Sequence, residues 1–194
     1  IETAYELAEL SAVPTQIISP AKSSPIIQVN NDTLIAAYLI TQPHVKISKK
    51  KLMNLVMTNP KFNGIFPDTK DGFWTGQDMF TMFLPDISFK KANKSYDSDP
   101  SDKNMVIIDN GDFKQGILDK TIIGSTLIHM IYDCFGSVAV KNFLDNNQRM
   151  LNRWLAGYSF TVGLGDCVPT DEDNSKITEF VKSKVKDVNT VIKE

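Results

Sequence analysis

The 194-residue sequence predicts a mixed α+β fold, and three features support this prediction. An apolar stripe at three- and four-residue spacing runs from Val140 to Leu155, which is typical of a helix with one buried side. A second stripe at helical spacing occupies residues 177–192. The pair Asn110-Gly111 follows the β-branched run 105–109, and it is the strongest short β-hairpin signal in the chain.

The start of the chain predicts a short helix over residues 3–11. Thr3 and Glu6 match the T-x-x-E capping box, in which each side chain satisfies a free backbone N–H at the helix start. Pro14 ends this helix, because the residue before a proline is pushed out of the α region.

Three short segments follow. Residues 15–19 and 25–29 are predicted strands joined by a small polar link. Residues 33–40 are apolar enough for a buried strand or a buried helix, and periodicity over eight residues does not separate the two.

A second helix is predicted after Ser48, its N-cap, with Leu52, Met53 and Val56 on its buried side. Its first turn holds the lysines of 49–51, which oppose the helix macrodipole. An exposed turn of weak helix propensity is the favoured explanation, and a phosphate or an acidic partner is the alternative.

The middle of the chain alternates loops with short elements. The loop 59–76 is rich in aromatic residues and is expected to pack onto a surface. Thr75 and Asp78 indicate an N-cap, and the short apolar helix that follows ends before Pro85. Residues 90–104 are the least hydrophobic stretch and predict a surface loop.

The hairpin's second strand is predicted at 116–119, and a helix at 127–135. Ser137 and Gly157 are the predicted N-cap and C′ residue of the long helix that comes next. Beyond it, 158–164 is expected to be extended.

The glycine-rich stretch GLGD, residues 163–166, predicts a tight turn. It lacks the GxxxxGK[ST] pattern of a P-loop and the strand–GxGxxG–helix order of a dinucleotide site. Taken by its physics alone, the pattern favours glycines used for turn geometry.

Composition narrows the possible classes. A net charge of −2 argues against a uniformly basic nucleic-acid binder. Two cysteines, Cys134 and Cys167, are too few for a disulfide framework, which favours a reducing compartment. No apolar run reaches 18 residues, so a soluble protein is expected. Because Ile1 is not a methionine and a helical pattern runs into Glu194, we expect a piece of a longer protein.

Catalytic and metal-binding patterns are absent from the sequence. His44 and His129 have no second histidine or thiol at ligand spacing. No nucleophile elbow is present, and the acidic run 171–173 lacks the spacing of an EF-hand. The residues by themselves indicate a folded segment without its own catalytic set.

Five motifs occur in a recognisable order. They are AELSAVPTQIISPAKSSP, NNDTL, FWTGQDMF, GILDKTIIGS and NRWLAGYSFTVGLGD. This series resembles the successive signatures of the largest subunit of multisubunit DNA-directed RNA polymerase of the eukaryotic, archaeal and viral type. The similarity extends over essentially the whole chain.

The resemblance implies three parts. Residues 1–22 would be the tail of the active-site region, 23–165 the pore domain, and 166–194 the start of the helical funnel. Pore and funnel form the secondary channel through which nucleoside triphosphates enter and backtracked RNA 3′ ends leave. The aspartates that bind the catalytic Mg²⁺ in this family are absent, so the rest of the subunit would hold the metal and the isolated segment would not catalyse nucleotide addition.

Seven residues match motif positions expected to face the channel or active centre, none of them catalytic or metal-binding: Asn31, Asp32, Thr33, Lys120, Gly163, Gly165 and Asp166. The alternative is that they mainly hold turns and packing. Implied partners are the other polymerase subunits, especially the second-largest, template DNA, nascent RNA, nucleoside triphosphates and a cleavage factor at the funnel, with no membrane.

The chain also departs from the family pattern. Asn31 replaces the usual glutamine before DTL, and Gln77 directly follows Gly76 where a lysine is usual. This divergence and the richness in Asn, Lys and Ile favour an AT-rich lineage such as a large DNA virus, with location in the host cytoplasm or virion; a nuclear cellular enzyme is the alternative. Rival functions are a non-enzymatic interaction module and, more weakly, a small nucleotide-binding hydrolase.

Overall fold

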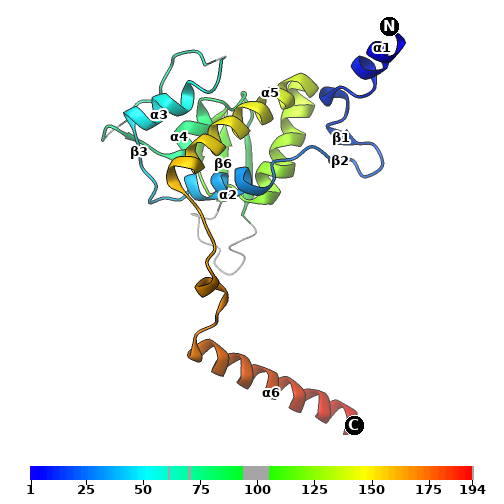
Figure 1. Ribbon diagram of the computed structural model, residues 1–194, viewed down its shortest axis with the longest axis vertical. Coiled ribbons are helices and arrows are strands. Elements are labelled where there is room, and N and C mark those ends of the chain that lie inside the picture. The colour runs from blue at the N-terminus through cyan, green and yellow to red at the C-terminus, as the bar shows by residue number, and fades with distance from the viewer. Residues whose placement is uncertain (61, 70, 94–104, 194) are drawn as a thin grey trace. The chain divides into compact units, whose positions relative to one another are not determined.

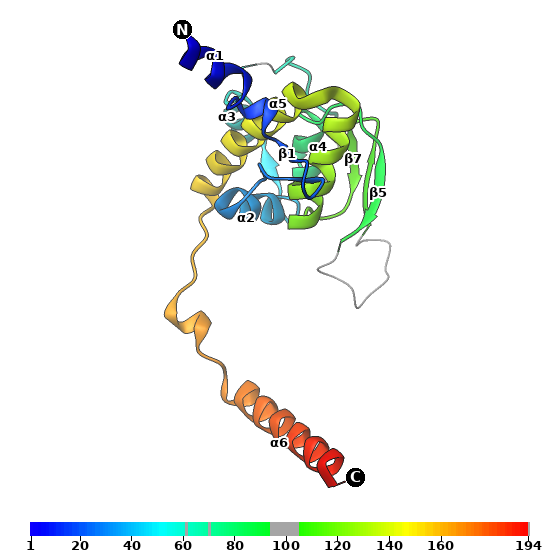
Figure 2. The same ribbon diagram turned by 90° about the vertical axis from the view of Figure 1, so that its right-hand side faces the viewer.

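The computed structural model describes residues 1–60, 62–69, 71–93 and 105–193. The chain forms two units, Ile1–Tyr158 and Ser159–Glu194, and each is described by itself (Figures 1 and 2). The predicted loop 90–104 lies mostly outside the described residues, but its first residues belong to a strand.

The elements of the first unit are α1 (Glu2–Glu9), η1 (Val13–Thr15), β1 (Ile18–Ser19), β2 (Ser24–Pro25), α2 (Asn31–Ile40), β3 (Ile47–Ser48), α3 (Lys49–Val56), β4 (Phe73–Trp74), α4 (Gly76–Thr81), β5 (Phe89–Ala92), β6 (Met105–Asp109), β7 (Asp112–Gln115), the π-helical turn η4 (Ile122–Thr126) and α5 (Leu127–Tyr158). The second unit contains η5 (Leu164–Cys167) and α6 (Asp171–Lys193). The mixed α+β prediction is confirmed.

The largest sheet has the antiparallel order β5-β6-β7. Asn110 (φ 50°) and Gly111 (φ 78°) form the predicted two-residue hairpin turn between β6 and β7. The predicted strand 116–119 is wrong, because so short a turn starts β7 already at Asp112. The chain leaves the sheet at Gly116 (φ 112°), where its backbone passes close to Val106. A Cβ on residue 116 would lie 2.6 Å from the Val106 Cα.

The core lies between this sheet and the helices α2, α4 and α5 (Figure 2). The undecided segment 33–40 is helical, and α2 buries Thr33, Ala36, Ala37 and Ile40 at helical spacing against α5. Phe80 of α4 is fully buried. Full burial of a side chain of this size contributes about 1.5–3 kcal/mol.

The helix α5 is broken where the sequence indicates. Gly136 has non-helical angles (φ 78°, ψ 178°), directly between the predicted helix 127–135 and its successor. The predicted C′ residue Gly157 is wrong, because the helix continues to Tyr158 and Ser159 (φ 68°) takes the left-handed conformation. By length and hydropathy alone the stretch Ile122–Tyr158 would be long enough to cross a membrane, but it supplies core residues and we assign it to the core.

The predicted helix starts have different outcomes. The N-cap predicted at Thr75 is confirmed, and it forms a capping box in which the Thr75 N–H donates to Asp78 Oδ2 at 2.8 Å. The box at Thr3 is wrong, since α1 begins at Glu2 and its N-cap is Ile1. Ser48 precedes α3 but makes no side-chain capping bond.

The buried side of α3 and the aromatic loop were also predicted. Leu52 is buried as expected, whereas Met53 is wrongly placed on the buried side because it is 41% exposed. The loop prediction is confirmed: Phe66 packs against Phe62 and Trp74, and Trp74 Nε1 donates to the Pro67 carbonyl at 2.9 Å.

The second unit contains an extended stretch, the turn η5 and the helix α6. Thr170 Oγ1 accepts the Asp173 N–H at 3.2 Å, and the acidic residues of 171–173 occupy the first turn, where they complement the macrodipole. The predicted terminal helix is confirmed, and it starts before its apolar stripe.

Candidate functional site

A cleft in the first unit opens at the N-terminus of α2, and predicted site residues line it. Its volume is about 430 Å³. The chain enters α2 through Asn30 in an extended conformation and Asn31 with φ 50°, which turns the first helical residues toward the cleft. The lining residues are Val13, Ile27, Gln28, Val29, Asn30, Asn31, Asp32, Thr33, Lys141, Leu144, Asp145, Gln148 and Asn152.

The predicted residues Asn31, Asp32 and Thr33 therefore lie together on one wall of the cleft. Thr33 is 5% exposed, and its Oγ1 donates to Asn152 Oδ1 of α5 at 2.9 Å. This hydrogen bond ties the α2 N-terminus to the opposite wall. Asn31 and Asp32 remain exposed to solvent.

The cleft carries charges of both signs. Lys141 and Asp145 come from α5 and face the start of α2, which carries Asp32. The ion pairs found among the described residues do not use any of these three groups. Free backbone N–H groups at a helix start favour anions, so the cleft combines a weakly anion-attracting end with two exposed carboxylates.

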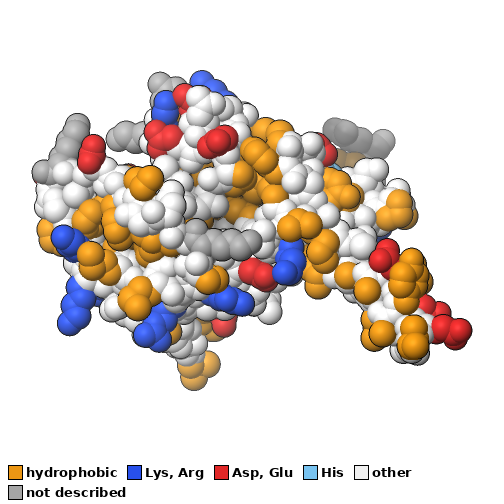
Figure 3. Space-filling view, turned by 90° about the horizontal axis from the view of Figure 1, so that it is seen from above, with side chains coloured by type: hydrophobic (Ala, Val, Ile, Leu, Met, Phe, Trp, Pro, Cys, Tyr) orange, Lys and Arg blue, Asp and Glu red, His pale blue; other side chains and the backbone are white. Residues whose placement is uncertain are grey.

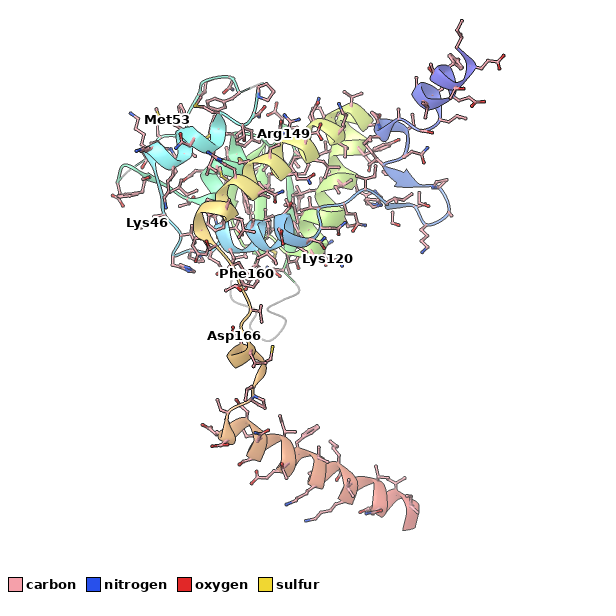
Figure 4. All side chains as sticks on the ribbon, viewed as in Figure 1. Lys46, Met53, Lys120, Arg149, Phe160 and Asp166 are labelled. Atoms are coloured by element: carbon pink, nitrogen blue, oxygen red, sulfur yellow. The ribbon has the colours of Figure 1, made fainter. Side chains whose placement is uncertain are left out.

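Lys120 lies at the margin of the cleft. It is exposed and begins the helical stretch before η4, and Figure 4 shows it close to the start of α2. A Cβ built on Gly124 would lie 3.7 Å from Gln28 Oε1 and 4.0 Å from Lys120 Cγ, so Lys120 neighbours the Gln28 side of the cleft. Its neighbour Asp119 is buried and accepts the Ile122 N–H at 2.8 Å.

The other three predicted residues belong to the second unit. Asp166 Oδ2 accepts the Gly163 N–H at 2.7 Å, and this bond closes the predicted tight turn as η5. Gly163 has φ −86°, and a Cβ on Gly165 would meet no atom within 4 Å. The turn therefore does not require glycine at either position, contrary to the interpretation from turn geometry.

Sequence reasoning missed the polar wall that α5 contributes. Lys141, Asp145, Gln148 and Asn152 are spaced by three or four residues and share one helix face, and this polar spacing was the available signal. Their meeting with α2, more than a hundred residues away in the chain, depends on the tertiary fold.

The departure from the family motif at Gln77 has a structural role. Gln77 Nε2 donates to the carbonyls of Thr41 at 2.9 Å and Gly116 at 3.0 Å. Thr41 Oγ1 in turn accepts the Leu118 N–H at 3.1 Å. This network joins the end of α2 to the start of α4 and to the chain leaving the hairpin.

Within the part of the chain that the structure describes, no group of three His, Cys, Asp or Glu side chains is arranged to hold a metal ion. The site thus provides a polar wall of mixed charge, held together by the Thr33–Asn152 hydrogen bond. Such a wall can position or pass a charged molecule.

The family model for RNA polymerase Rpb1, domain 3, matches residues 16–167. Because the match covers most of the chain, the chain belongs to this family and is a segment of the largest subunit of RNA polymerase. The predicted resemblance is confirmed, and membership implies assembly with other polymerase subunits.

Proposed function

We propose that this segment forms part of the pore and secondary channel beside the active centre of a DNA-directed RNA polymerase. Residues 1–22 are then the tail of the active-site region, 23–165 the pore domain and 166–194 the start of the funnel. The cleft at the start of α2 is the observation that supports this proposal, because motif residues line it and its walls are joined by the Thr33–Asn152 bond.

A channel wall must attract charged substrates without retaining them. The start of α2 and Lys141 favour the phosphates of nucleoside triphosphates or an RNA 3′ end, while Asp32 and Asp145 weaken that attraction. Nucleotidyl transfer itself uses Mg²⁺, which residues elsewhere in the subunit bind. The second-largest subunit, template DNA, nascent RNA and a cleavage factor are the expected partners.

The source of the chain remains an expectation from its sequence. We propose an intracellular enzyme of a large DNA virus, acting in the host cytoplasm or virion. A nuclear cellular polymerase is the alternative.

The test uses the assembled polymerase with Asp32→Asn or Lys141→Met. We expect the apparent KM for nucleoside triphosphates in elongation to change about 2- to 5-fold, because each exposed charge contributes up to about 1 kcal/mol. Cleavage of backtracked transcripts should change as well. Asp133→Asn is the matched control, since it removes an exposed carboxylate of α5 outside the cleft. If both cleft variants match this control, the channel role is rejected.

The alternative of a non-enzymatic interaction module is favoured by one observation. The apolar residues of α6 are more than half exposed within their unit, among them Phe180 (64% exposed) and Ile192 (75% exposed). A chain that is never recovered with catalytic polymerase subunits would support this alternative.

A further inference from the structure

A second groove in the first unit lies between α3 and the end of α5. Its volume is about 320 Å³, and α3 packs directly on α5. Lys51 and Asn54 come from α3, and Arg153, Trp154 and Tyr158 come from α5. This groove shares no lining residue with the cleft at α2.

The groove is cationic at its edges and apolar at its base. Lys51 and Arg153 are exposed, and the ion pairs among the described residues do not involve either. Among the residues that the structure describes, no carboxylate lines the groove. Figure 3 shows Lys and Arg side chains gathered on the side of the molecule where Figure 1 shows α3.

The base of the groove is a stacked aromatic pair. The rings of Trp154 and Tyr158 are 4.5 Å apart at an interplanar angle of 17°. Trp154 is 7% exposed, whereas Tyr158 is 47% exposed and presents an aromatic surface to the groove that Lys51 and Arg153 also line. A partner segment that carries both carboxylates and an apolar side chain would match this surface.

We propose that this groove docks an acidic segment of another protein of the polymerase assembly. Carboxylates of the partner pair with Lys51 and Arg153, the latter through the two-pronged geometry that guanidinium groups offer to carboxylates. An apolar side chain of the partner rests on Tyr158. Nucleic acid is the poorer match, because two cations make a short track for a phosphate backbone and the chain carries a net charge of −2.

The experiment treats the purified assembled polymerase with a carbodiimide, which joins a lysine amine directly to a carboxylate. We expect Lys51 to be joined to an Asp or Glu of another protein in the enzyme, as read by mass spectrometry. Lys51→Arg should abolish this product while keeping the partner, because it keeps the charge but removes the amine. Lys50, which does not line the groove, is the internal control.

Charge reversal gives the second readout. K51E/R153E should lower retention of the crosslinked protein at least about tenfold, while K50E leaves it unchanged. The proposal is overturned if Lys51 is joined only to its own chain, or if it is joined to another protein no more often than Lys50. It is also overturned if the double variant keeps all of its protein partners. If the double variant keeps its protein partners but loses crosslinking to RNA or DNA, the groove binds nucleic acid instead.

Discussion

Thr33 and Asn152 lie 119 residues apart in the chain, and their side chains meet in a 2.9 Å hydrogen bond between Thr33 Oγ1 and Asn152 Oδ1. The bond joins the first turn of α2 to the polar face of α5 beside the cleft. It places motif residues of α2 in a fixed position relative to residues that no motif indicated.

The first prediction concerns this bond. Thr33→Val keeps the shape of the side chain but removes the hydroxyl, and we expect the free energy of unfolding to fall by about 1 kcal/mol. Amides in the first turn of α2 should exchange faster. Thr33→Ser retains the donor and serves as the control. Equal stability of the Val and Ser variants in urea denaturation would show that the hydrogen bond contributes nothing.

The second prediction concerns the close approach of two helices. A Cβ on Gly76 would overlap the Ile40 carbonyl and lie 2.6 Å from its carbon. Gly76→Ala should therefore reduce the free energy of unfolding by about 1–3 kcal/mol or more. Gly157→Ala is the contrasting variant. Gly157 lies in α5, and a Cβ added there would meet no neighbouring atom within 4 Å, so this change should stabilise the fold by up to about 1 kcal/mol. Denaturation midpoints that move in the same direction would contradict this packing.

The third prediction concerns pH. The hydrogen bond and charge of Lys114 lower the pKa of Asp109 below 3.8, and Asp109 raises the pKa of Lys114 above 10.5. Because the pKa of Asp109 is lower in the folded state, its ionised carboxylate stabilises the fold at pH values above its unfolded pKa. This stabilisation is lost as the pH falls through its folded pKa. Because the pKa of Lys114 is higher in the folded state, its ammonium group stabilises the fold at pH values below its unfolded pKa. This stabilisation is lost as the pH rises through its folded pKa.

The pair therefore stabilises the fold at pH values between the ordinary pKa values of Asp and Lys. This contribution is weak, since both side chains are about half exposed. In Lys114→Met the pKa of Asp109 should rise toward 3.8, as measured by NMR titration of its carboxyl carbon. Lys22→Met, in the turn between β1 and β2, should leave that pKa unchanged.

The fourth prediction concerns the turn η5. Asp166→Ala removes the acceptor of the Gly163 N–H, and a lost cap of this kind costs about 1 kcal/mol locally. Exchange of the Gly163 amide should accelerate about fivefold. Asp166→Asn retains a side-chain oxygen, so it should preserve most of the protection. Comparable exchange in wild type and the Ala variant would mean that the bond is not formed in solution.

Local chemistry explains which elements could be predicted from the sequence. The Asn110-Gly111 turn and the break at Gly136 both use positive φ values, and residue type alone indicates them. The segment 33–40 is ambiguous in the sequence because its apolar run suits either structure, and in the fold it is a helix that packs on α5.

The two capping boxes show where local patterns fail. Thr75 follows β4 and has extended angles (φ −92°, ψ 169°), so the helix must begin there. The helix α1 begins at Glu2, which places Thr3 inside its first turn, where it cannot act as the N-cap. The two similar patterns, T-x-x-E at Thr3 and T-x-x-D at Thr75, therefore have opposite outcomes.

The candidate site could be predicted only where it is contiguous. Asn31, Asp32 and Thr33 are neighbours in sequence and share the cleft, whereas Asn152 and Lys141 required the folded chain. The roles of all seven predicted residues remain predictions, and Gly163, Gly165 and Asp166 belong to the unit that is described apart from the cleft.

The helix α2 is held at both ends, by Thr33 at its start and by the Thr41 network at its finish. Inserting or deleting one residue between them would rotate one end by about 100° relative to the other, since the helix has 3.6 residues per turn. Both anchors cannot then be satisfied together. Evolution of this segment can therefore exchange the partly exposed side chains of α2, but the number of residues between Thr33 and Thr41 should stay constant among its descendants.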